Sequence, residues 1–337
     1  FTIPFFAFGK RAQVNLNRTL SIYPSAFPNS EPSWVHRIRR FNTNATAASA
    51  EPDQVPSSVV QAMQEGYERH KASGNVEPEE NPDEIFDAVL MTVKYIVRES
   101  GIAKEDIKFI SLSAQMHSLI AMNADNQRLT ENITWADNRA NDYADLIEKS
   151  YDGFELYQRT GTPIHPMSPL SKIFWMRHEE PEIFKQTAMF ADLKTYVLFQ
   201  LYERFVIDYS LGSATGMMNL EQLDWDHKAL ELLGIERNQL PQLVPTTHVL
   251  TGMKKRYATL MGIDEQTPVI VGASDGVLSN LGVNSYQKGE VAVTIGTSGA
   301  IRTVINQPKT DEKGRTFCYI LDKDQYVIGG PVNNGGV

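Results

Sequence analysis

The sequence of 337 residues contains one cysteine, Cys318, so it can form neither an internal disulfide nor a multi-cysteine zinc site. It also lacks any run close to the ~20 apolar residues that cross a membrane. Its 32 Lys and Arg residues against 41 Asp and Glu give a net charge of −9, which argues against nucleic acid as a partner. The single cysteine fits a reducing compartment, and we expect a cytoplasmic protein.

Several catalytic motifs are missing as well. The sequence has no G-x-x-x-x-G-K-[ST] phosphate loop, no G-x-G-x-x-G, no H-E-x-x-H and no G-x-S-x-G. Nothing therefore supports a Walker-type nucleotide site, a Rossmann cofactor site, a zinc peptidase or a hydrolase elbow, and no residue is assigned to a metal held by the protein.

The two ends of the sequence look atypical. Residues 1–50 carry six basic residues and one acidic residue, a charge of +5, so the remainder carries −14. Such a composition is typical of a transit peptide, and an artefact of cloning or reading frame produces it too. We therefore predict that residues 1–58 are foreign or disordered. The last residues, 333–337, follow a strand-like run, 326–328, which predicts a chain that is incomplete at both ends.

Between these ends, helical and strand patterns alternate. Asn81-Pro82 starts a predicted helix that Gly101 ends. The other predicted helices cover residues 193–201, 226–233 and 275–281, and the predicted strands cover residues 107–114, 205–207 and 268–271. This order predicts an α/β domain with a mixed or parallel sheet. Four further strands, 291–295, 300–305, 316–321 and 326–328, predict a meander that begins a second domain. The predicted boundaries are 59–285 and 286–337.

Two polar loops follow strands of the first domain, where sites in α/β sheets gather. Gln115-Met116-His117-Ser118 joins an amide, an imidazole and a hydroxyl, although a polar loop with a capping histidine fits equally. Trp135-Ala136-Asp137-Asn138-Arg139 combines a flat apolar face, an acceptor and a forked donor, which suits a polyhydroxylated ligand with an anionic end. A buried Trp beside a surface ion pair is the alternative.

Two glycine-containing turns complete the candidate site. Asp275, in Gly272-Ala273-Ser274-Asp275-Gly276, lies at a predicted helix start, where the helix dipole favours an ionised carboxylate that could accept a hydroxyl proton. The alternative for Asp275 is a helix cap. The turn of Gly296, Thr297, Ser298 and Gly299 offers N–H groups and hydroxyls to an anion such as phosphate, or is an ordinary hairpin.

Taken in order, these motifs resemble the FGGY family of carbohydrate kinases. The series continues with Lys172-Ile173-Phe174-Trp175, Asp208-Tyr209-Ser210 and Ala214-Thr215-Gly216. The run from Gly161 to Leu170, with His117-Ser118 and the segment 243–248, resembles its gluconokinase branch. The Asp-x-Gly-Thr-Thr turn with which the family opens is absent from residues 1–80.

The resemblance implies an actin-like ATPase (ribonuclease H-like) fold of two domains, the second truncated. It implies a kinase that uses ATP and Mg²⁺ to phosphorylate D-gluconate to 6-phosphogluconate, with Asp275 as general base. Gly296, Thr297, Ser298 and Gly299 then contact the nucleotide, and the sugar is held by Gln115, Met116, His117, Trp135, Asp137, Arg139 and Asp275.

The resemblance leaves two alternatives open: a kinase for xylulose or another pentulose, and a catalytically dead sugar-binding remnant. The cation that binds the gluconate carboxylate is also open, and the candidates are Arg139, His117, His165 and Lys172. The oligomeric state is open too, a homodimer included.

Overall fold

The computed structural model describes residues 6–8, 12–14, 79–287, 289–295 and 299–332. Most of the predicted segment 1–58 therefore lies outside the described residues. Within it the structure describes one antiparallel pair, β1 (Phe6–Phe8) and β2 (Ala12–Val14). No helix among the described residues is long and apolar enough to cross a bilayer.

Helix α3 (Pro82–Ser100) confirms the first predicted helix and both of its ends. The Asn81 side chain accepts the N–H groups of the first turn, and Gly101 closes the helix at φ 63°. The apolar stripe buries Phe86, Leu90 and Val93 against α11 (Lys255–Met261) and the sheet behind it. Local caps and one apolar face are sufficient to specify this helix.

The centre of the first domain is a mixed sheet, as predicted. β4 (Ile110–Ala114) and β13 (Val269–Ser274) are parallel, and β12 (Val249–Leu250) is antiparallel to β13. A second parallel pair joins β8 (Val206–Asp208) to β11 (Gln242–Val244). The predicted strand 107–114 is shorter than expected. Its first residues follow a 3₁₀ turn, η3 (Lys104–Asp106), without joining the sheet.

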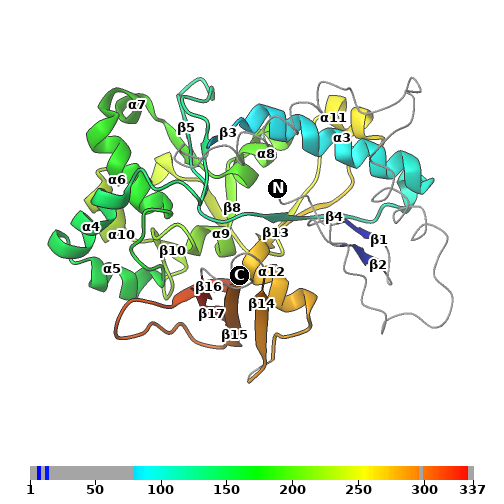
Figure 1. The fold of residues 1–337 in the computed structure, drawn as a ribbon. Helices are drawn as coiled ribbons and strands as arrows, with labels where there is room; N and C mark the ends of the chain where they lie inside the picture. Colours follow the sequence, from blue (N-terminus) through cyan, green and yellow to red (C-terminus); the bar gives the residue numbers. More distant parts are fainter. Residues whose placement is uncertain (1–5, 9–11, 15–78, 288, 296–298, 333–337) are drawn as a thin grey trace, which may run out of the picture.

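Short strand pairs and helices surround this sheet (Figure 1). The antiparallel pairs are β3 (Glu79–Glu80) with β6 (Asn132–Ile133), β5 (Ile120–Met122) with β7 (Met189–Ala191), and β9 (Met218–Asn219) with β10 (Asp224–Trp225). The helices are α4 (Asn141–Ser150), α5 (Gly153–Thr160), α6 (Pro169–Glu179), α7 (Pro181–Gln186), α8 (Leu193–Tyr202), α9 (Tyr209–Ser213), α10 (His227–Leu233) and α12 (Asp275–Gly282), with a 3₁₀ turn η4 (Arg237–Gln239).

The last four strands form an antiparallel sheet, but not the predicted meander. The strands are β14 (Val291–Ile295), β15 (Gly299–Ile305), β16 (Phe317–Asp322) and β17 (Gln325–Val332). Their order is β14-β15-β17-β16, so β17 lies between β15 and β16.

The connection between β15 and β16 is compatible with this order. It is long, and it is fixed to the first domain at Asp311, which accepts the hydroxyl of Tyr157 at 2.9 Å and the N–H of Thr316 at 2.9 Å. This attachment carries the chain past the position beside β15. The short β16–β17 hairpin then returns β17 to that position.

One face of the four-stranded sheet packs on the first domain. Phe317, Tyr319 and Val327 share a core with Ala273 and Val277 of β13 and α12. On β14 and β15 the other face is largely exposed, with the side chains of Val291, Val293, Ile295 and Ile301. On β16 and β17 the other face is buried in the main core of the first domain, through Cys318, Ile320 and Tyr326. The sheet is therefore held directly against the turn that carries Asp275.

Candidate functional site

The loop after β4 is ordered by its neighbours. The Gln115 amide donates to Glu80 at 3.0 Å, and Ser118 Oγ accepts the N–H of Leu193 at 3.1 Å. His117 adopts φ 65° and is buried, with Nε2 3.3 Å from the hydroxyl of Tyr319. Burial, reinforced by the nearby Lys172 charge, lowers the pKa of His117 to about 3. Its ring is therefore neutral at ordinary pH and does not offer a cation to a carboxylate.

The second predicted loop forms a charge cluster around Arg139. Both carboxylate oxygens of Asp137, which is fully buried, accept the Nε–H of Arg139 at 3.0–3.1 Å. The Arg139 guanidinium also pairs with Glu79 at 2.6 Å and lies 5.0 Å from the Trp175 ring centroid. Trp135 beside it is 52% exposed. The alternative of a buried Trp with a surface ion pair is therefore wrong, because the Trp is exposed and the ion pair largely buried.

Lys172 of α6 joins these two loops, which we call the sugar-side loops (residues 115–118 and 132–139). Its side chain is fully buried, and Nζ donates to the carbonyls of His117 at 2.7 Å, Ile133 at 3.3 Å and Thr134 at 2.6 Å. Burial lowers the pKa of Lys172 to about 7. Because its Nζ is engaged by three backbone carbonyls, Lys172 is not available to a substrate carboxylate. It acts as a structural tie.

His165 is the exposed member of the candidate cations. Its Nδ1 accepts the N–H of Met167 at 3.2 Å, so the neutral ring carries its proton on Nε2. Desolvation lowers the pKa of His165, and the charge of Lys172 lowers it by a smaller amount. The exposed residue thus has one N–H donor, at Nε2.

Asp275 is the first residue of α12, at the carboxyl end of β13. The helix cap is its neighbour Ser274, whose Oγ accepts the N–H of Val277 at 3.3 Å. Asp275 is therefore not the N-cap residue, although its half-buried carboxylate accepts the N–H of Gly276, in the same first turn, at 2.7 Å. Burial raises the pKa of Asp275, and the Gly276 N–H and the charge of Arg302 oppose that rise.

Buried polar side chains hold the strand end that carries Asp275. Ser210 Oγ accepts the N–H of Ser274 at 3.1 Å and donates to Ser274 Oγ at 2.8 Å. Asp208 caps α9 through the N–H groups of Ser210 and Leu211, and it pairs with buried Lys194 at 2.6 Å. The motif Asp208-Tyr209-Ser210 therefore positions the Asp275 turn from behind.

Gly272 lets β13 approach β4 where their register shifts, between Ile270 and Ala273. It has φ 67°, and a Cβ at this position would lie 1.8 Å from the carbonyl oxygen of Leu112. Only glycine fits so close an approach. The shift sets the direction in which residues 273–275 leave the sheet.

The predicted phosphate turn cannot be located, because Gly296, Thr297 and Ser298 lie outside the described residues. Gly299 starts β15 opposite Ile295. On β15 the structure adds Arg302, which sequence reasoning missed. Its guanidinium lies over Gly276, which the Cε of Met116 approaches from the sugar-side loops. A single arginine in the otherwise apolar and small run 300–305 was the signal that could have found it.

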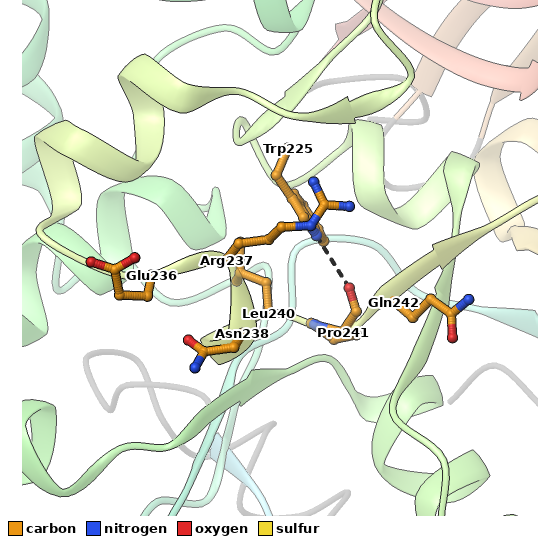
Figure 2. A pocket seen from close by; sticks show the side chains of 7 residues that line it. All are labelled: Trp225, Glu236, Arg237, Asn238, Leu240, Pro241 and Gln242. Carbon is orange, nitrogen blue, oxygen red and sulfur yellow. Dashed lines mark hydrogen bonds between the residues drawn. The ribbon is translucent and has the colours of Figure 1, made fainter.

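A pocket of about 500 Å³ lies elsewhere, around η4 (Figure 2). It is lined by Trp225, Glu236, Arg237, Asn238, Leu240, Pro241 and Gln242. The Trp225 indole donates to the carbonyl of Pro241 at 3.1 Å and forms part of its wall. None of the predicted site residues lines this pocket, so it is not the candidate site.

Among the described residues, no group of three or more His, Cys, Asp or Glu side chains is placed to hold a metal ion. We therefore derive no step through a metal held by these residues.

Comparison with known proteins places these motifs in a wider context. Residues 53–282 match the model for the N-terminal domain of the FGGY family of carbohydrate kinases. Over 259 residues the chain is 54% identical to a gluconokinase of Bacillus subtilis (strain 168). The aligned residues cover 77% of this chain and 50% of the relative. A xylulose kinase of the same organism is 28% identical over 253 residues, covering 74% and 50%.

Solved structures agree with the sequence relatives. The crystal structure of gluconate kinase from Lactobacillus acidophilus superposes with a TM-score of 0.74 at 41% identity, covering 77% of this chain and 52% of that one. A ligand-bound structure described as xylulose kinase from the same organism gives the same values. The chain spans about half the length of the curated relatives it matches.

Proposed function

The chain belongs to the FGGY family of carbohydrate kinases, and on this premise we propose that the whole protein transfers the γ-phosphoryl group of ATP to the 6-hydroxyl of D-gluconate. The observation that carries the proposal is the placement of Asp275. Its carboxylate is half-buried and lies at the end of a strand. The N-cap position of α12 is filled by Ser274, not by Asp275. Identity of 54% to a gluconokinase supports gluconate as the acceptor.

In this reaction Asp275 acts as the general base. Its carboxylate takes the proton of the 6-hydroxyl while that oxygen bonds to the γ-phosphorus and the bond to the β-phosphate oxygen breaks, giving 6-phosphogluconate and ADP. General-base catalysis contributes typically ~10²–10⁴ in rate, and positioning and charge neutralisation supply most of the remainder. Mg²⁺ would arrive with ATP as part of the nucleotide substrate.

Gln115, Met116, His117, Trp135, Asp137 and Arg139 are the residues we propose for the sugar end. Trp135 offers its exposed face to the carbon chain, whereas Asp137 orients Arg139. Arg139 faces two carboxylates and Lys172 is fully engaged, so we assign the substrate carboxylate chiefly to the Nε2 N–H of His165. Gly296, Thr297, Ser298 and Gly299 are proposed to contact the nucleotide phosphates.

Calorimetric titration of this chain with D-gluconate tests the sugar assignment, with D-xylulose and glycerol as controls. We expect selective binding of gluconate. Preferential binding of D-xylulose would instead favour the pentulose alternative. The similarity to the Lactobacillus acidophilus structure described as xylulose kinase is compatible with that alternative. The variant His165→Ala should weaken gluconate binding without altering the binding of D-xylulose.

Turnover of the whole protein tests the catalytic assignment. Asp275→Asn should lower kcat by ~10²–10⁴ while the gluconate Kd stays within a few-fold. Near-normal turnover of this variant would refute the general-base role. If the unmodified protein binds gluconate but transfers no phosphoryl group, the sugar-binding remnant is the correct alternative.

A further inference from the structure

Arg302 of β15 is the charged side chain next to Asp275 that the proposed mechanism does not use. Its Nη1 donates to Thr294 Oγ1 at 3.3 Å, and its Nη2 lies 3.4 Å from the position that a Cβ on Gly276 would occupy. Its buried Nε has no hydrogen-bond partner among the described residues. The guanidinium is thus fixed at one side and has unused donor capacity at the other.

The charge of this guanidinium is only partly balanced. Burial lowers the pKa of Arg302, and the nearby Asp275 opposes that change. Within the described residues, no direct ion pair joins Arg302 to Asp275. Arg302 is half-buried, and a cation whose buried N–H is unpaired is unfavourable unless an anion completes it. The arrangement therefore indicates an anionic group that is supplied from outside the described residues.

The position of Arg302 identifies which anionic group that is. Its contact with Gly276 places it one residue from Asp275, and its contact with Thr294 places it near the end of β14. An anion here lies at the hydroxyl that Asp275 deprotonates. The gluconate carboxylate is at the opposite end of the carbon chain from that hydroxyl, so it does not meet this requirement.

We propose that Arg302 binds the phosphoryl group while it passes from ATP to the sugar hydroxyl. This rests on the proposed function and adds a residue to it. The phosphoryl group carries its charge on oxygens that a forked guanidinium donor can bind in pairs. No covalent bond to Arg302 forms, and the proton still goes to Asp275. Removing such a donor weakens the interaction with the transition state more than the interaction with either bound substrate.

The kinetic test uses Arg302→Met and Arg302→Lys in the whole protein, with Arg315→Met as the control. The Arg315 side chain is 72% exposed and pairs with Asp311, in the connection that leads to the same sheet. We expect Arg302→Met to lower kcat by ~10²–10³, the loss seen when one donor to a transition-state anion is removed. The gluconate Kd should change by less than about threefold. Arg302→Lys should recover only part of the loss, and Arg315→Met should leave kcat unchanged.

The pH profile gives a readout that a structural role would not produce. Because the Arg302 charge holds the pKa of Asp275 down, Arg302→Met should move the acid limb of kcat to higher pH. An unshifted limb with normal kcat would overturn the proposal. A raised KM for gluconate at unchanged kcat would also overturn it, because that result assigns Arg302 to the sugar carboxylate.

Binding of ADP with aluminium fluoride, a planar mimic of the phosphoryl group in transfer, separates this proposal from the proposed function. With gluconate present, the unmodified protein should bind ADP more tightly when aluminium fluoride is added, and Arg302→Met should lose at least about tenfold of that gain. Equal gains in both proteins would refute the role of Arg302. If the unmodified protein phosphorylates no sugar, the proposed function fails, and Arg302 is judged on this binding alone.

Discussion

Charged side chains at the two ends of the candidate site have different surroundings. At the sugar-side loops, Lys172 and Arg139 direct their donors to carbonyls and carboxylates of the same chain. At the transfer end, which comprises Asp275, Gly276 and Arg302, a buried N–H of Arg302 has no partner among the described residues. The donors of the first end are already satisfied within the chain, whereas we propose that a ligand completes the second. The charge of a side chain therefore does not by itself indicate a ligand contact. Whether its donors are already bonded within the chain determines whether it is available to a ligand.

The largest effect is expected where the prebuilt end is broken. Lys172→Met removes three hydrogen bonds and leaves the buried His117 carbonyl without a donor, because the Ile133 and Thr134 carbonyls still accept from other backbone N–H groups. A buried group left unsatisfied costs ~1–3 kcal/mol, and the two other lost hydrogen bonds add to this cost. We expect an unfolding free energy lower by about 3 kcal/mol, measured by urea denaturation, together with loss of gluconate binding in calorimetry. Lys149→Met, at an exposed i,i+4 pair with Asp145, is the matched control and should change neither quantity. Similar behaviour of the two variants would remove the structural role of Lys172.

A smaller effect is expected within the Arg139 cluster. Asp137→Asn removes a fully buried carboxylate that accepts from Arg139, so the guanidinium should lose its fixed orientation. Charge-assisted hydrogen bonds are worth ~1.5–3 kcal/mol, and we expect the gluconate Kd to rise by about tenfold. Glu79→Gln changes a carboxylate that is more exposed and should raise the Kd less. A larger effect of Glu79→Gln would show that Glu79, rather than Asp137, orients Arg139.

A smaller and pH-dependent effect follows from the lowered pKa of Lys172. In the folded chain this pKa is about 7, and in the unfolded chain it returns towards its usual value near 10.5. Between these values the unfolded state binds a proton that the folded state does not, so stability rises with pH through this window. The Tm of the unmodified chain should therefore rise relative to the Tm of Lys172→Met as the pH increases from 7 upward. Parallel curves for the two proteins would mean that the lysine stays charged when folded.

The smallest effect is expected at the pocket around η4. Arg237 lines this pocket and pairs with Asp224, away from every predicted site residue. Arg237→Ala should leave gluconate binding and turnover unchanged, measured by calorimetry and by a coupled kinase assay. A clear loss of gluconate affinity would move the sugar site to this pocket.

Sequence patterns predicted best what depends on neighbours along the chain. The bounds of α3 follow from Asn81, Pro82 and Gly101, and all of these act within one turn. The order of the last four strands could not be read in this way. It involves contacts between distant residues, such as the hydrogen bond from Tyr157 to Asp311, which joins residues 154 positions apart.

The same distinction between neighbouring and distant residues applies to the candidate site. The motifs located the loops, because polar residues after strands are visible in the sequence. The tasks of single side chains depend on distant partners, so the sequence did not distinguish Lys172 as a tie from Lys172 as a ligand contact. For the same reason it did not separate Asp275 from Ser274 as the helix cap, and it gave no partner for Arg302.

Gly272 has a consequence for how the gene can vary. Every other amino acid would bring a Cβ to 1.8 Å from the carbonyl oxygen of Leu112 and would require the same unusual φ of 67°. Each missense change at this codon therefore alters the spacing of β4 and β13 and, through it, the turn that holds Asp275. Even the conservative missense change Gly272→Ala is thus expected to abolish function, although no atom of Gly272 belongs to the site.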